Sequence, residues 1–351
     1  MSRTQQEVDA PPGPSKARFG AIDLGSHTIR LLVGELQGGK RMEPLHGDRK
    51  ITRLAQGFQL HQCLMEPAMG RSLRVLEDYA RVLKSMHVSS VACGATGVIR
   101  RAQNSGEFLH RVHSSSGISP RILSEQEEAF LSAKGVLSVL PPCSGAVILF
   151  DLGGSSTEFT VFHPRQQDKL WCTSVFLGAA TTTERFLIKD PPGTAAMNQA
   201  TAHMATTLGP TLERVSRCAG DSSPSAPPVT LVGTAGTVTT LAAMKLEMTH
   251  YRAERVNGLI LEKDWIAGKI EELASSSLEE RRHMKGLEKG REDIILGGAL
   301  VVHKILEGLN LDTMVVTDAG LLEGLLLDGA ERILGLPKTL LGPLTWHTQK
   351  G

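Results

Sequence analysis

The chain has 351 residues, of which 41% are hydrophobic and 21% are charged, a mixture typical of a globular protein with about two domains. Its 38 basic and 37 acidic residues leave a net charge of +1, which provides no general field to attract nucleic acid or an anionic membrane. Any polyanion must therefore be bound by local groups.

Both ends of the chain are expected to lie outside the folded core. Residues 1–16 contain no apolar run long enough for a signal peptide or a membrane span and are predicted to be a disordered tail, and residues 336–351 are predicted to be a C-terminal tail. The five cysteines are scattered and show no paired or zinc-binding spacing. We therefore expect a cytoplasmic protein with reduced thiols, no membrane contact and no nucleic-acid partner.

The first half opens with two predicted strands, at 19–24 and 28–36, joined by a tight turn. The same pattern returns after a Pro-Pro-Cys-Ser-Gly break, with strands at 146–152 and 157–163, so that AIDLGSHT and LFDLGGSST are two copies of one motif. A copy recurring at this distance indicates duplication of a whole lobe. We predict an α/β protein with a cleft between two lobes, residues 17–128 and 129–320.

Helical periodicity and turn signals place the remaining elements. Residue 321 begins a helix that is expected to run to 335 and rejoin the first lobe, and the Pro- and Ser-rich segment 219–228 is predicted to be a surface loop. The other predicted helices cover residues 69–86, 125–139, 198–215, 238–246, 262–275 and 291–309, and the other strands cover 229–232 and 314–316.

Three turns rich in glycine and hydroxyl residues each follow a predicted strand. Such turns direct backbone N–H groups and hydroxyls towards one point, which suits phosphate oxygens. Glycine and serine also form ordinary turns, but three such turns, two of them after Asp-Leu-Gly, favour phosphate binding. The candidate residues are Gly25 and Ser26 in the first turn, Gly153, Gly154 and Ser155 in the second, and Gly233, Thr234, Gly236 and Thr237 in the third.

Asp23 and Asp151 each lie at the end of an apolar strand, where a charged carboxylate needs a cation or hydrogen-bond donors. A hydrated Mg²⁺ beside phosphate would supply that partner, and Glu158 on the next strand would add a third carboxylate. The alternative is an aspartate that accepts hydrogen bonds only from its own turn.

The segment SEQEEA contains the candidate catalytic base. Ser124 and Glu127 fit a capping box at the start of the helix, which gives most of the acidic residues here a structural explanation. Glu128 lies about a hundred degrees further round the helix and is free of that role, so it is the better candidate for a base. Arg30 and Arg100 follow turns in the first half and are candidate phosphate ligands, although surface arginines are common.

Two other groups of basic residues are given structural explanations. His110 and His113 share a helical face without a third ligand, so no metal is assigned to them. The basic cluster between residues 281 and 291 is predicted to be a solvated helical face, with a polyanion path as the minor alternative.

Several motifs together resemble the exopolyphosphatase and guanosine-pentaphosphate phosphatase family, from about residue 19 to 329. They are GAIDLGSHTIRLLV, GATGVIRRAQN, SEQEEA, LFDLGGSSTEF, LVGTAGTVTTLAAM and GREDIILGGALVV, and their order and spacing agree with that family. The chain resembles the short form without an extra C-terminal helical domain. The resemblance implies two actin-like (ribonuclease-H-like) lobes with phosphate and Mg²⁺ between them.

The resemblance also implies roles for the candidate residues. Glu128 would activate the attacking water, Asp151 and Glu158 would organise metal and water, and Asp23 would assist. The three turns would hold phosphate, and Arg30 and Arg100 would neutralise its charge.

Four positions depart from the family pattern: His27 replaces Asn, Ser155 replaces Gly, and Phe130 and Leu322 each replace Arg. The changes at Phe130 and Leu322 remove positive charge, and a protonated His27 would compensate in part.

The expected substrate is inorganic polyphosphate or guanosine pentaphosphate, and polyphosphate is favoured because all the recognisable contacts address phosphate. A homodimer is possible. One alternative is an acetate- or sugar-kinase-like phosphotransferase, which would require an acceptor for turnover. Another is a non-catalytic actin-like binding module, which would tolerate Glu128→Gln.

Overall fold

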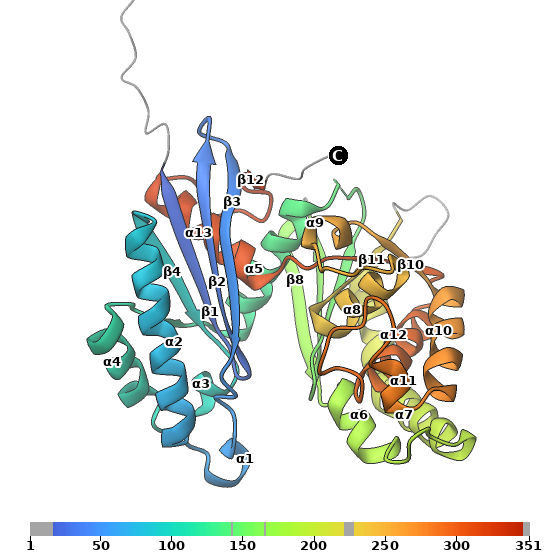
Figure 1. Ribbon diagram of the computed structural model, residues 1–351. Helices are drawn as coiled ribbons and strands as arrows, with labels where there is room; N and C mark the ends of the chain where they lie inside the picture. Colours follow the sequence, from blue (N-terminus) through green and yellow to red (C-terminus); the bar gives the residue numbers. More distant parts are fainter. Residues whose placement is uncertain (1–16, 142, 165, 221–227, 347–351) are drawn as a thin grey trace, which may run out of the picture. The chain divides into compact units, whose positions relative to one another are not determined.

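The computed structural model describes residues 17–141, 143–164, 166–220 and 228–346. The predicted tail at 1–16 and most of the predicted loop at 219–228 lie outside the described residues. Two compact units are present (Figure 1). Unit 1 contains residues 17–122, Leu325–Pro337 and 342–346, and unit 2 contains the described residues of Leu123–Gly324 together with Lys338–Leu341. Each unit combines helices with one sheet, so the predicted α/β class is confirmed.

The boundary between the units differs from the predicted one. Unit 2 begins at Leu123 rather than after Glu128, so the whole of helix α5 (Glu125–Val139) belongs to unit 2. The reason is packing, because α5 contacts strands β7 and β8 of that unit.

Unit 1 contains a six-stranded sheet in the order β12-β3-β2-β1-β4-β5. Its strands are β1 (Arg18–Leu24), β2 (Thr28–Gln37), β3 (Arg41–Ile51), β4 (Ser90–Ala95), β5 (Arg121–Ile122) and β12 (Thr345–Trp346). Its helices are α1 (Phe58–His61), α2 (Glu66–Ser85), α3 (Val98–Arg101), α4 (Ser105–Ser116) and most of α13 (Leu321–Ile333).

Glycines in the first two strands of unit 1 allow helices to approach both faces of the sheet. A Cβ at Gly20 would lie 2.6 Å from Leu83 of α2, whereas a Cβ at Gly34 would lie 2.8 Å from Leu326 of α13. Gly20 is paired with Val33, the residue before Gly34, so the two glycines face opposite sides. Helices α2 and α13 therefore cover opposite faces of this sheet, and α2 is joined on its side by α4 (Figure 1).

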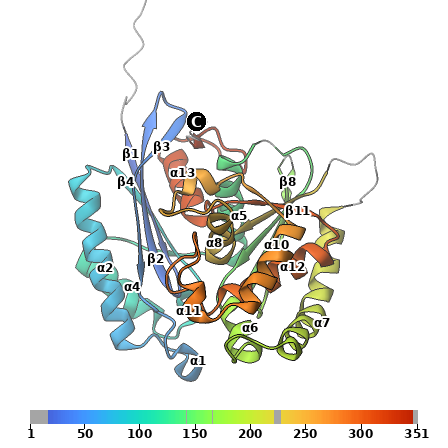
Figure 2. The same ribbon diagram turned by 45° about the vertical axis from the view of Figure 1, so that its right-hand side comes forward.

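Unit 2 contains a six-stranded sheet in the order β10-β11-β9-β6-β7-β8. Figure 2 shows β8 and β11 of this sheet together with helices α7, α10 and α12. Its strands are β6 (Val147–Leu152), β7 (Thr157–His163), β8 (Gln166–Val175), β9 (Thr230–Thr234), β10 (Ile260–Glu262) and β11 (Thr313–Val316). Its helices are α5, α6 (Ala179–Phe186), α7 (Thr194–Ala219), α8 (Ala235–Lys245), α9 (Ala253–Val256), α10 (Lys263–Ser275), α11 (Leu278–Arg281) and α12 (Ile295–Gly308).

The two faces of the unit 2 sheet differ in chemistry. Ile148, Phe150 and Leu152 of β6 alternate onto one face and join a large apolar core with α7, α8, α10 and α12. Asp151 lies between two of these residues, so its side chain is on the opposite face, the one against which α5 packs. The apolar core thus fixes the direction in which the polar side chains of β6 and β7 project.

The prediction of a C-terminal tail at residues 336–351 is partly wrong. Within them, Leu340 and Leu344 are buried, and β12 pairs in parallel with β3. The N–H of Leu344 also donates to Glu331 of α13. Residues 342–346 are therefore held in unit 1 by a strand pairing, whereas Leu340 belongs to unit 2; residues 347–351 lie outside the described part of the chain.

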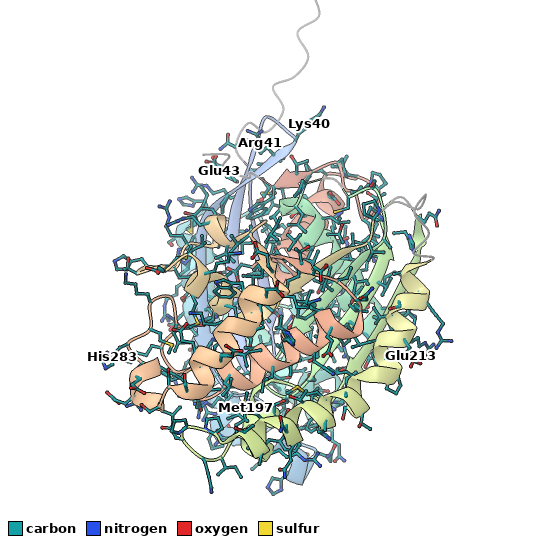
Figure 3. All side chains as sticks on the ribbon, turned by 90° about the vertical axis from the view of Figure 1, so that its right-hand side faces the viewer. Lys40, Arg41, Glu43, Met197, Glu213 and His283 are labelled. Carbon is teal, nitrogen blue, oxygen red and sulfur yellow. The ribbon has the colours of Figure 1, made fainter. Side chains whose placement is uncertain are left out.

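Charged side chains lie on the outer surface at the tip of the β2–β3 hairpin (Figure 3). Figure 3 shows Lys40 pointing outward from the tip of the β2–β3 hairpin, with Arg41 and Glu43 close by. In the described part of the chain, no helix combines the length and the apolar character needed to cross a membrane.

Candidate active site

The centre of the candidate site in unit 2 is a pair of carboxylates on neighbouring strands. Asp151 of β6 is directly opposite Glu158 of β7 in the antiparallel register. Side chains in such a pair have Cβ atoms roughly 4.5–5.5 Å apart and lie on the same face. Asp151 is exposed and Glu158 is partly buried. The pair lies on the face against which α5 packs, and Asp151 remains exposed to solvent there.

Glu158 is held in place by two hydroxyl groups. Ser156 Oγ donates to Glu158 Oε1 at 2.6 Å, and Ser174 Oγ of β8 donates to the same oxygen at 2.9 Å. Hydrogen bonds to a charged acceptor are stronger than those between neutral groups. Because both hydroxyls bind Oε1, the orientation of the carboxylate is fixed while neither hydroxyl occupies Oε2.

The turn after β6 is built against the start of helix α6. Gly153 N–H closes the turn on the carbonyl of Ser156 at 3.0 Å. The carbonyls of Gly153 and Gly154 accept from the first N–H groups of α6, including that of Ala179 at 3.0 Å. The positive end of α6 is therefore bonded to the outer side of the turn, which leaves the opposite side of its peptides for an anion.

Gly178 makes this contact between the turn and α6 possible. A Cβ at position 178 would lie 2.5 Å from the carbonyl carbon and oxygen of Gly154 and 2.7 Å from the carbonyl oxygen of Gly153. These are backbone atoms, which cannot rotate away as a side chain can. Gly178 is therefore a residue of the candidate site that was not predicted from the sequence, because it lies outside all three turns.

The third predicted turn lies beside the carboxylate pair. Thr234 at the end of β9 is opposite Asp151 in the parallel register, and α8 begins at the next residue. Thr234 is the N-cap of α8 but makes no side-chain capping bond. Ala235 adopts a left-handed φ of +72°, a strained conformation for a residue with a Cβ. The first N–H groups of α8 are thus presented next to Asp151, in the geometry used for anions at helix N-termini.

Arg291 lies directly over this turn. A Cβ at Gly236 would overlap the guanidinium of Arg291, and that guanidinium is ion-paired with Glu288 at 2.5 Å. The prediction of a solvated basic face is wrong for Arg291 and for Arg281, two of its five residues; the other three are Arg282, Lys285 and Lys289. Arg291 is partly buried, whereas Arg281 is fully buried and its Nε and Nη2 donate to the carbonyl of Leu273.

The outward-facing side of the same segment is marked by His283, which projects from the surface in Figure 3. Arg282, Lys285 and Lys289 are exposed, as the sequence predicted. The sequence feature that could have identified Arg291 as a residue of the candidate site is its place inside the motif GREDII, not its charge.

The capping box at the start of α5 is confirmed. Ser124 Oγ accepts from the N–H of Glu127 at 3.2 Å, and Glu127 Oε2 accepts from the N–H of Ser124 at 3.1 Å. Glu127 is therefore turned back to the cap, as predicted, and Glu128 is the next residue around the helix.

Glu128 lies on the side of unit 2 that carries the carboxylate pair. Burial raises the pKa of the Cys172 thiol above its ordinary value, and the charges of Glu125 and Glu128 raise it further, so both carboxylates are near Cys172. Cys172 is two residues before Ser174 on β8, and their side chains share the face on which Ser174 binds Glu158. Residues of α5, β6, β7 and β8 therefore contribute to one polar region.

Unit 1 contains the second copy of the turn with different chemistry. Gly25 N–H bonds to the carbonyl of Thr28 at 3.1 Å, as Gly153 does to that of Ser156. Asp23 is opposite Arg30, the position that corresponds to Glu158 in unit 2, and Arg30 Nη2 donates to Asp23 Oδ2 at 2.7 Å. The duplicated hairpin thus carries an ion pair in unit 1 and two carboxylates in unit 2.

Ser26 and Arg100 are linked through helix α3. Ser26 Oγ accepts from the N–H of Val98 at 2.9 Å, two residues before Arg100. Gly97 has a φ of +54°, and a Cβ there would overlap Ser26 Oγ, so both its conformation and its space require glycine. The structure brings Ser26 close to the helix that carries Arg100, within unit 1.

The donor set is compatible with Mg²⁺. Within the described residues, no group of three or more His, Cys, Asp or Glu side chains could hold a metal ion alone. Mg²⁺, however, is usually bound by one or two carboxylates together with water and substrate phosphate oxygens. Asp151 and Glu158, both in unit 2, supply two adjacent carboxylates. The residues present therefore fit such an ion.

Two of the departures from the family pattern have a structural context. The ring of Phe130 lies under Lys338, whose Nζ is 5.0 Å from the ring centroid, a cation–π distance. Leu322 is buried on α13, with 7% of its surface exposed. The side chains of Phe130 and Leu322 are therefore both accommodated by packing within unit 2.

Comparisons with known proteins point to one family. The model of the Ppx/GppA phosphatase family matches residues 32–333. Exopolyphosphatase 2 of Mycobacterium tuberculosis is 28% identical over 322 residues, which cover 88% of this chain and 98% of that protein. Guanosine-5'-triphosphate,3'-diphosphate pyrophosphatase of Vibrio vulnificus is 29% identical over 314 residues, which cover 88% of this chain and 58% of that protein. The solved structure of the Ppx/GppA family member of Aquifex aeolicus has a TM-score of 0.78 and 28% identity, and the match covers 92% of this chain and all of that one.

Proposed function

Because the chain belongs to the Ppx/GppA phosphatase family, we propose that it releases terminal orthophosphate from inorganic polyphosphate or guanosine pentaphosphate. Relatives named for hydrolysis of phosphoanhydrides match most of its length, so the chain is a phosphoanhydride hydrolase. The observation that carries the proposed reaction is the carboxylate pair Asp151 and Glu158, flanked within unit 2 by two turns suited to phosphate.

In the proposed reaction a water molecule attacks the terminal phosphorus. Glu128 accepts the proton of this water, a new P–O bond forms, and the bond from phosphorus to the bridging oxygen breaks. The products are orthophosphate and a chain shortened by one phosphate. Glu128 is assigned as the base because Glu127 caps the helix, while the charge of Glu128 acts on Cys172, which shares a face of β8 with Ser174.

The two turns of unit 2 would hold the phosphate oxygens through backbone N–H groups, and Arg291 over Gly236 would add a positive charge. Asp151 and Glu158 would hold Mg²⁺, which neutralises charge on phosphate oxygens when bound. The hydroxyls of Ser156 and Ser174 keep Glu158 in a fixed orientation for that role. In unit 1, the Gly25–Ser26 turn, Arg30 and Arg100 are proposed to bind further phosphate oxygens.

The test compares Glu128→Gln with Glu127→Gln. Both substitutions remove one charge from the same turn of α5, and glutamine at position 127 keeps a capping box. We expect Glu128→Gln to lower kcat about 10²–10⁴-fold on both substrates, the usual contribution of a general base. Glu127→Gln should retain activity close to the wild type, and circular dichroism should show both variants folded.

If Glu128→Gln hydrolyses polyphosphate and guanosine pentaphosphate at the wild-type rate, Glu128 is not the base. If the wild-type protein releases no orthophosphate from either substrate in the presence of Mg²⁺, the proposed function itself is wrong.

A further inference from the structure

Phe176 is a large aromatic side chain that remains 68% exposed at the edge of the candidate site in unit 2. It follows the last residue of β8, and two residues separate it from the first residue of helix α6. Its neighbour Leu177 is buried in the apolar core, so the chain does place an apolar side chain inward at this point. Phe176 is therefore exposed at a point in the chain where the next apolar side chain, that of Leu177, is buried.

The backbone holds Phe176 in a rigid three-residue turn. The N–H of Leu177 donates to the carbonyl of Val175 at 2.8 Å, which makes Phe176 the central residue of a γ-turn. The carbonyl of Leu177 in turn accepts from the buried hydroxyl of Thr157 at 2.6 Å. The ring is thus presented to solvent by a fixed support, which lowers the entropy cost of a contact with a ligand.

The residues on either side of Phe176 both belong to the candidate site. Ser174 binds the carboxylate of Glu158, and Gly178 packs against the backbone of Gly153 and Gly154. Phe176 is two residues from each, so its Cα lies within about 8 Å of both. The backbone of Phe176 therefore lies next to two residues that contact Glu158 and the turn at 153–156.

The two candidate substrates differ in how they could interact with the ring of Phe176. Inorganic polyphosphate presents only charged oxygens, and the negative face of an aromatic ring offers no attraction to them. A nucleoside polyphosphate carries a flat, apolar base on the same phosphate chain. Stacking of a base on an aromatic side chain contributes about 1–3 kcal/mol as judged by alanine substitution.

We propose that Phe176 is a specificity-determining residue that stacks on the base of a nucleoside polyphosphate whose phosphates are bound by the turn at 153–156. This inference rests on the proposed function and specifies its substrate class. It makes nucleoside-capped phosphate chains, rather than inorganic polyphosphate, the substrates that this chain binds best.

The test measures kcat/KM for Phe176→Ala, Phe176→Trp and the wild type on guanosine pentaphosphate and on inorganic polyphosphate. We expect Phe176→Ala to lower kcat/KM for the nucleotide about 5–150-fold, the equivalent of 1–3 kcal/mol, and to leave the value for polyphosphate unchanged. Phe176→Trp retains a stacking surface and should keep nucleotide turnover. Ile188→Ala is the matched control, because Ile188 is 80% exposed in the same unit but follows α6 rather than the turn.

Equal losses on both substrates, or no loss on either, would overturn the proposal. A shift from dimer to monomer in Phe176→Ala by light scattering, with unchanged nucleotide kinetics, would show that a second copy covers the ring and would also overturn it. Equilibrium dialysis with radiolabelled guanosine pentaphosphate separates this inference from the proposed function. If the wild-type protein hydrolyses neither substrate, the proposed hydrolysis is wrong. If Phe176→Ala nevertheless binds guanosine pentaphosphate more weakly than the wild type does, the stacking role of Phe176 is supported.

Discussion

Substitution of Gly178 by alanine should displace the turn that holds phosphate without changing any charged group. The added Cβ would lie 2.5 Å from backbone atoms of Gly154, whereas ordinary contact begins near 3.4 Å, so the turn or the start of α6 must move by about 1 Å. Overpacking of this kind costs about 1–3 kcal/mol of folding stability. A misplacement of about 1 Å at a reacting centre costs on the order of 10²-fold in rate.

We therefore expect Gly178→Ala to remain folded, with a lower free energy of unfolding in urea, and to lose about two orders of magnitude in kcat/KM for orthophosphate release. The matched control is Gly268→Ala in the exposed middle of α10, where an added Cβ meets nothing within 4 Å. That change should stabilise the protein by about 0.5–1 kcal/mol, because alanine is the better helix former, and leave activity intact. A Gly178→Ala protein with wild-type stability and wild-type activity would refute the role assigned to this contact.

Three further predictions concern the same unit. Ala235→Gly should relieve the strained φ of +72° and raise the free energy of unfolding by about 0.5–1 kcal/mol, whereas Ala235→Val should lower it, as measured by urea denaturation. Ser174→Ala removes one of the two hydroxyls that orient Glu158, so kcat/KM should fall about tenfold, with Ser174→Thr restoring most of it. The pKa of Cys172 is raised by burial and by nearby carboxylates, so Glu128→Gln should lower that pKa and speed alkylation of Cys172 by iodoacetamide several-fold at pH 8. Mass spectrometry of the Cys172 peptide would measure this, and an unchanged rate would place Glu128 elsewhere.

The hairpins and the capped helix α5 could be predicted from sequence because their signals are local. Apolar residues alternate or run continuously through 19–24 and 146–152, and a capping box depends only on residues three apart. The structure confirms β1, β6 and the Ser124–Glu127 cap within a few residues of the predicted bounds.

Strands β3 and β8 were missed because neither carries a clear apolar pattern. The sequence RMEPLHGDRKI of β3 is mostly charged or polar, and QQDKLWCTSV of β8 begins with four polar residues. Both strands lie at or near a sheet edge, where only one neighbour or one face demands apolar residues. Their place in the sheets is set by pairing with β2 and β7 rather than by their own composition.

The missed residues of the candidate site depend on contacts between distant segments. Gly178 matters because of Gly154, and Arg291 matters because it lies over Gly236, some 55 positions earlier in the chain. Phe176 is informative only because it is exposed, which composition does not reveal. No local pattern encodes these relationships, because each one arises when the sheet brings its turns to the same end.

The interleaving of the two units along the chain has a consequence for biosynthesis. Unit 1 begins the chain but is completed only by α13 and the segment 342–346, whereas unit 2 is almost continuous from Leu123 to Gly324. During translation, nearly all of unit 2 emerges from the ribosome while the sheet of unit 1 still lacks the helix that contacts Gly34 and Ala92. One apolar face of the unit 1 sheet therefore stays uncovered until α13 has been synthesised. A nascent chain stalled near residue 320 is accordingly the species most in need of a chaperone.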